Sequence, residues 1–177
     1  YLVREREGFK KLYEEYKAKS GLNDSALAPR KIVSEVRFVS PIEGTPLEPE
    51  EMGKMKPEDV VDYILEPKNY EGMEKVSGWG TAKDALAASF KADVKKRPLE
   101  YLNIDLKKLE SLEPEFLEKI FYSVSEAVRE GSFKKEGWER LIDLSCGIVE
   151  TKNKEKEWKD CFLAILWVLR DGFGEES

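Results

Sequence analysis

Three successive stretches near the C-terminus repeat one register of mostly apolar side chains at a spacing of 20 to 21 residues. Within each stretch these side chains recur at i, i+3, i+4 and i+7, the spacing that places them on one face of an α-helix. The pattern therefore predicts three amphipathic helices, each with one face to bury. The positions are Leu117, Ile120, Phe121, Val124, Ala127 and Val128; Trp138, Leu141, Ile142, Ser145, Ile148 and Val149; and Trp158, Cys161, Phe162, Ile165, Val168 and Leu169.

The outer two stretches also end alike, with Ala-Val-Arg-Glu-Gly at 127–131 and Val-Leu-Arg-Asp-Gly at 168–172. Their glycines lie 41 residues apart, a period typical of stacked helical hairpins of the HEAT or armadillo kind. Short polar turns at 134–137 and 151–157 predict antiparallel neighbours. We expect an all-α fold, either an irregular helical bundle or a short HEAT-like stack of antiparallel helices. The register covers only about 60 residues, fewer than a secure solenoid needs, which favours the C-terminal half of one compact domain.

The rest of the chain suggests one helical domain over 1–177, with an N-terminal helix in 1–21, a connecting segment in 22–57 and a helical core in 58–177. Four side chains give the first helix its apolar face. The connecting segment is rich in proline, and within it 32–39 is either a short strand or a helical turn, followed by a short helix at 47–53. The first residue is not Met, so we expect a fragment of a larger protein. The four side chains on the apolar face of the expected N-terminal helix are Phe9, Leu12, Tyr13 and Tyr16.

Proline, glycine and capping residues set the boundaries expected within the core. Pro57 opens a helix that Pro67 ends, and a glycine-containing loop follows at 66–80. Thr81 is a good N-cap, and Asp84 three residues on is close to a capping box for a helix that continues to Arg97. Short helical pieces at 98–112 precede a helix that starts at Pro114.

Six packing motifs between Phe38 and Phe173 follow one another in a recognisable order: a Ser-Pro turn, an acidic stretch with Met, a helix, a Gly-rich turn, a helix ending before Pro, and Trp-initiated helices. In this order the segment resembles HEAT-like helical regions of large, uncharacterised bacterial and archaeal proteins. The resemblance implies a scaffold region, in some cases within prokaryotic defence proteins, and carries no catalytic residues to transfer. The motifs are Ser40-Pro41, Glu50-Glu51-Met52 with Met55, Asp59 to Leu65, Gly78-Trp79-Gly80, Val94 to Pro98, and Trp138 with Leu141 to Cys146.

Composition narrows the possible functions. The chain has no His, so Ser-His-Asp and Cys-His mechanisms are excluded within it. It also lacks Gln and is rich in Lys and Glu, which suggests a source that lives at high temperature. A net charge of −6 disfavours wholesale coating of a phosphate backbone. No run approaches the roughly 18 apolar residues of a membrane span, so we expect a cytoplasmic protein without a membrane partner.

The two cysteines, Cys146 and Cys161, fall on or beside apolar helix faces. We interpret them as small buried hydrophobic residues, with a disulfide between neighbouring helices as the alternative. Two cysteines without histidine make a zinc site a poor interpretation. We expect no metal and no other cofactor.

Lys91, Lys95, Lys96 and Arg97 form the densest basic cluster. Cations at the end of a helix complement its dipole, which explains them structurally. The functional alternative is a weak nucleic-acid or anion patch, which would ordinarily carry more charge and interleaved aromatic residues.

Two other patterns have a structural and a functional interpretation. Asp59, Asp62 and Glu66 are spaced to share one helix face, which is either a solvated surface or, as paired carboxylates, an acid–base or cation site. The turn Gly78-Trp79-Gly80-Thr81 precedes a helix, where free N–H groups can hold an anion, but it lacks the lysine and spacing of a phosphate loop. In both cases we favour the structural interpretation.

The sequence thus predicts a non-enzymatic helical scaffold or protein-interaction domain within a larger prokaryotic protein, whose partner is another protein or the remainder of its own chain. The first alternative is a nucleic-acid-associated accessory domain, for example in a defence system. The second is a carboxylate- or metal-dependent enzyme.

Overall fold

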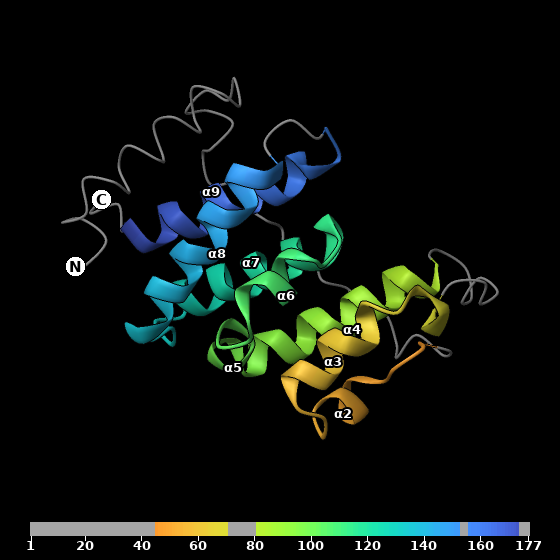
Figure 1. The fold of residues 1–177 in the computed structure, drawn as a ribbon. Helices are drawn as coiled ribbons and strands as arrows, with labels where there is room; N and C mark the ends of the chain where they lie inside the picture. The colour runs from red at the N-terminus through yellow and green to blue at the C-terminus, as the bar shows by residue number, and fades with distance from the viewer. Residues whose placement is uncertain (1–44, 71–80, 153–155, 174–177) are drawn as a thin grey trace.

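A computed structural model describes residues 45–70, 81–152 and 156–173. Three expectations from the sequence lie outside them: the N-terminal helix, the alternative strand or turn at 32–39, and the Gly78-Trp79-Gly80 turn. All regular secondary structure in the described part is helical, so the prediction of an all-α fold is confirmed there (Figure 1). In chain order the elements are α2 (Pro49–Met52), α3 (Pro57–Ile64), the 3-10 turn η1 (Pro67–Asn69), α4 (Ala82–Lys96), α5 (Pro98–Leu102), α6 (Leu106–Glu110), α7 (Pro114–Arg129), α8 (Glu136–Lys152), the 3-10 turn η2 (Lys156–Trp158) and α9 (Lys159–Phe173).

The helix boundaries follow local chemistry closely. Pro57 and Pro114 occupy the first turns of α3 and α7, where a missing N–H costs nothing. The Thr81 hydroxyl accepts a hydrogen bond from the Asp84 amide at 3.2 Å, and the Asp84 carboxylate accepts one from the Thr81 amide at 2.6 Å. This is the expected capping box of α4.

Some boundaries differ from those expected. α2 is confined to 49–52, inside the helix expected at 47–53, and α8 begins at Glu136, within the expected turn at 134–137. Trp158 lies in η2 rather than in α9. Helix ends of this kind are set by packing as well as by propensity, so they move by a residue or two.

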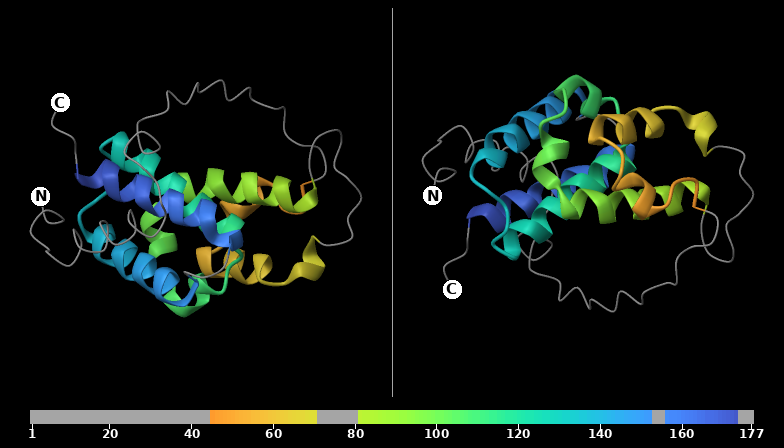
Figure 2. Two further views of the ribbon diagram at one scale, coloured as in Figure 1. Left: turned by 90° about the horizontal axis from the view of Figure 1, so that it is seen from above. Right: turned by 90° about the horizontal axis from the view of Figure 1, so that it is seen from below.

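The helices form two layers (Figure 2). In one layer α4 packs on α7 and α7 packs on α9, with α2 against α4. In the other layer α3 packs on α5, and both α5 and α6 pack on α8. Contacts of α5 with α4 and α7 join the layers.

Neighbours within the first layer run parallel. Lys83 near the start of α4 pairs with Glu113 before α7 at 2.5 Å, and Lys91 further along pairs with Glu126 at 2.8 Å. The same direction holds for α7 and α9, whose contacts include Tyr122 with Trp167 and Ser125 with Asp171.

α8 runs the opposite way to α9. Trp138 at its start lies against Gly172, near the end of α9, and Lys152 at its end lies over the ring of Trp158. The middle one of the three matched helices therefore crosses back through the second layer, and the outer two lie side by side.

α7 is the centre of the core, because it packs on both α4 and α9. The ring of Phe116, at the start of α7, packs against the ring of Phe90, with 5.9 Å between the ring centres. Phe90 in turn packs edge-on against Tyr101, with 5.3 Å between the ring centres. Aromatic pairs in this geometry stabilise a core beyond the area that they bury. The register seen in the sequence is largely the buried face: Leu117, Ile120, Phe121, Val124 and Ala127 are buried, while Val128 is half-buried.

The two glycines that end the matched stretches have different roles. Gly131 has φ of 69° just after α7, the left-handed conformation that ends many helices and that glycine adopts most readily. Gly172 lies inside α9, and a Cβ atom there would run into the ring of Trp138. The sequence likeness at these two positions therefore conceals two different constraints.

We expect Gly172→Ala to lower the free energy of unfolding by about 1–2 kcal/mol, because the added methyl group overpacks the α8–α9 contact. Gly53→Ala is the matched control, since a Cβ atom there meets its nearest neighbour at an ordinary 3.4 Å. Urea denaturation followed by circular dichroism measures both. Equal stability changes at the two positions would contradict the assigned contact with Trp138.

Candidate functional site

The predicted basic cluster lies at the C-terminal end of α4, but most of its charge is used inside the domain. Lys91 pairs with Glu126 of α7 at 2.8 Å. Lys95 pairs with Glu126 at 2.9 Å and with Glu130 at 3.1 Å. These contacts bridge α4 and α7 at the edge of their apolar interface.

The same contacts shift the ionisation of Glu126 and Lys95. Partial burial acts to raise the pKa of Glu126, but the hydrogen bonds and positive charges of Lys91 and Lys95 outweigh burial and lower it. Hydrogen bonds to Glu126 and Glu130 raise the pKa of Lys95. Both groups are therefore held in their charged forms.

Arg97 ends α4 and enters a buried polar network. Its guanidinium donates to the Asp93 carboxylate at 2.6 and 3.0 Å, and to the backbone carbonyls of Met52 at 2.8 Å and Met55 at 2.9 Å. Asp93 is 1% exposed, and the side chain of Arg97 is 15% exposed. Arg97 therefore ties the turn between α2 and α3 to the end of α4.

Tyr101 completes this network from α5. Its hydroxyl donates to the Asp93 carboxylate at 2.5 Å, and the guanidinium of Arg97 lies 5.5 Å from its ring centre. Burial and the hydrogen bond to Asp93 raise the pKa of the Tyr101 hydroxyl well above its ordinary value of 10. The phenol therefore stays protonated and acts as a donor to Asp93.

Lys96 alone among the four predicted residues is exposed without an ion pair to any described residue. The four cations thus do not form one uncompensated patch. A nucleic-acid or anion site made by these four residues stays a prediction from the sequence.

The predicted carboxylate face is only partly assembled. Asp59 and Asp62 lie on α3, but Glu66 follows the end of that helix and caps η1, so the assignment of all three to one helix is wrong. The helix stops at Ile64 because Pro67 follows closely. Asp62 pairs with Lys108 at 2.7 Å and Glu66 with Lys68 at 2.8 Å. In the described part of the chain no three Asp, Glu or Cys side chains are grouped as metal ligands.

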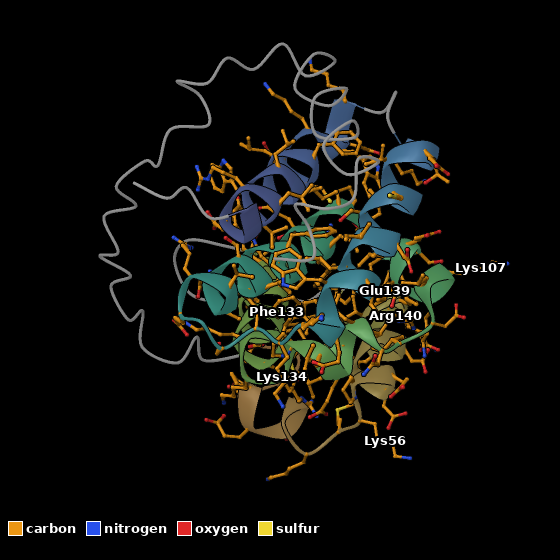
Figure 3. All side chains as sticks on the ribbon, turned by 90° about the vertical axis from the view of Figure 1, so that its left-hand side faces the viewer. Lys56, Lys107, Phe133, Lys134, Glu139 and Arg140 are labelled. Carbon is orange, nitrogen blue, oxygen red and sulfur yellow. The ribbon has the colours of Figure 1, made fainter. Side chains whose placement is uncertain are left out.

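Two polar anchors went unnoticed in the sequence. Arg140 of α8, labelled in Figure 3, lies at the C-terminal end of α5. Its guanidinium donates to the carbonyls of Leu102, Asn103 and Ile104 at 3.2–3.3 Å. A cation at a helix C-terminus neutralises its dipole and satisfies its free carbonyls. Nothing local in the sequence indicates this contact, since Arg140 and its acceptors are more than 30 residues apart.

The second anchor is Asp171, whose side chain is 7% exposed. It accepts a hydrogen bond from Ser125 at 2.5 Å and lies 3.4 Å from the Nε of Arg129. The available signal was a carboxylate at an apolar position of the helical register: Asp171 comes three residues after Val168 in α9, as Asp93 comes three residues after Phe90 in α4.

Both cysteines are free thiols, so the disulfide alternative is not observed. Burial, with a smaller contribution from the charge of Glu118, raises the pKa of Cys161 to about 12. Burial also raises the pKa of Cys146, which is only half-buried. Neither thiol has the depressed pKa that marks a reactive cysteine.

No family model, curated protein or solved structure matches this chain. None of the described helices combines the length and the apolar character needed to cross a membrane.

We expect Arg97→Met to lower the free energy of unfolding by about 3–5 kcal/mol, because the buried Asp93 carboxylate would lose its cationic partner. Lys95→Met is the control, since its more exposed ion pairs are expected to contribute about 0–1 kcal/mol. Guanidinium denaturation at neutral pH measures both. A loss at Arg97 no larger than that at Lys95 would show that the buried network does not stabilise the fold.

Alkylation at pH 8 should distinguish the two thiols. Cys146 is expected to react with iodoacetamide at least about tenfold faster than Cys161, because Cys161 is buried and its raised pKa leaves little thiolate. Both should react at similar rates in denaturant. Mass spectrometry of tryptic peptides measures the rates, and faster native labelling of Cys161 would contradict its burial beside α7.

Proposed function

We propose that this chain is a helical scaffold or protein-interaction domain, and that it forms a HEAT-like part of a larger prokaryotic protein. The observation that carries the proposal is the parallel arrangement of α4, α7 and α9 in one layer. Each step between them passes through helices of the other layer, α5 and α6 first and then α8.

This connectivity is what stacked helical hairpins produce. When a chain alternates between two layers, the helices that follow one another within a layer lie side by side and run in the same direction. The shared apolar register of the stretches that end at 131 and 172 then has a physical reason, because α7 and α9 pack against each other in the same layer. Extended helical layers of this kind serve chiefly as binding surfaces.

The use of polar side chains supports the same proposal. Arg97, Arg140 and Asp171 satisfy carbonyls or buried partners at helix ends. Such contacts fix the relative positions of helices and so favour a rigid surface over a mobile one. A pre-ordered surface loses less entropy when a partner binds.

The proposal is tested by tagging the natural gene with a proximity-labelling enzyme, identifying labelled proteins, and mixing each purified candidate with this chain in a calorimeter. We expect saturable binding by at least one candidate. If the partner is instead the remainder of the same polypeptide, chemical cross-linking of the natural protein is expected to join this domain to that remainder. The labelling enzyme expressed alone is the control. If no purified candidate binds and no such cross-links form, the proposal is wrong.

A further inference from the structure

Three segments far apart in the sequence carry an excess of positive charge in an acidic chain. Residues 53–58, 95–100 and 129–140 hold nine of the 30 Lys and Arg residues, but only five of the 36 Asp and Glu residues. The chain as a whole has a net charge of −6. We name these three segments together the basic end.

Side-chain contacts bring the segments together. Arg97 donates to the carbonyls of Met52 and Met55, which joins the α2–α3 turn to the end of α4. Lys95 pairs with Glu130 at 3.1 Å, which joins α4 to the end of α7. A Cβ atom at Gly137 would meet the side chain of Leu99 at 2.5 Å, so the start of α8 lies against α5.

Five lysines on the basic end hold charge that the domain itself does not use. All five are exposed, and none forms an ion pair with a described residue. Among lysines elsewhere in the described part, Lys83, Lys91 and Lys108 are paired with carboxylates. Lys107, Lys156 and Lys159 are exposed without an ion pair to a described residue, so the basic end differs in the number of such lysines that it brings together. The five are Lys54, Lys56, Lys96, Lys134 and Lys135.

Apolar side chains lie among these lysines. Met55, Leu99 and Phe133 are half-buried. Figure 3 looks towards this part of the molecule, with Lys56 and Lys134 in its lower half and Phe133 above Lys134. Charged residues interleaved with partly accessible apolar ones are suited to a ligand that carries both negative charge and apolar groups.

We propose that the basic end binds an acidic protein segment containing apolar residues, which deepens the proposed function by naming its surface and partner chemistry. Charge complementarity selects the partner. A nucleic acid fits less well, because Met55 and Leu99, two of the three apolar side chains among the lysines, are not aromatic and offer no ring on which a base could stack. The unpaired cations are all lysines, which cannot make the two-pronged phosphate contacts of arginine.

The test titrates the 177-residue chain into a fluorescent glutamate-rich peptide that also contains leucine, and measures anisotropy at low and high salt. The triple variant K56E/K134E/K135E is expected to weaken binding at least about tenfold. The control K68E/K156E/K159E changes the net charge equally at exposed lysines elsewhere, and is expected to weaken binding by less than about twofold. Thermal melts check folding, and K56Q/K134Q/K135Q replaces the first variant if it melts early.

Three results would overturn the proposal: no binding of the peptide by the natural chain, equal weakening by both triple variants, or tighter binding of single-stranded RNA or duplex DNA than of the peptide. The last result would assign the basic end to nucleic acid. If the peptide does not bind but a reconstituted protein complex forms in the calorimeter, the basic end is not the interface and the scaffold function stands.

Discussion

The largely buried guanidinium of Arg97 lies where four elements meet. It pairs with the fully buried Asp93 in α4 and lies over the ring of Tyr101 from α5. It also donates hydrogen bonds to the carbonyls of Met52 and Met55, at the end of α2 and in the turn that follows. Pro98 follows directly and opens α5, so the chain turns at the same point. Because a buried charge is costly unless it is fully paired, this network favours the arrangement in which these elements meet. The first part of the described domain depends on it.

α7 has the corresponding role in the apolar core. It contacts α4 on one side and α9 on the other, and most of its apolar register is buried. Ion pairs from α4 and the hydrogen bond between Ser125 and Asp171 set the positions of its neighbours along its length. The parallel layer that results is the basis for the proposed scaffold function, and the ends of its helices meet the turns that make up the basic end.

Local features of the fold were predictable. The capping box at Thr81 and Asp84, the proline starts of α3 and α7, and the buried faces of the three matched helices depend on residues within a turn or two of one another. The candidate site was less predictable. Lys91 and Lys95 looked like available charge, yet Glu126 is 35 residues away from Lys91 in the sequence and next to it in space. Glu66 looked like part of α3, whereas that helix ends before it.

The sequence by itself determined which segments are helical, where most of them begin, and which faces they bury, because hydrogen bonds and apolar periodicity within a helix are local. Only the tertiary structure decided that α7 and α9 lie parallel with α8 in the other layer, and which charges are paired. Those outcomes depend on contacts between residues more than 30 positions apart, such as Arg140 with the carbonyl of Ile104. No periodicity within one helix encodes such a contact, since its energy appears only when the layers pack.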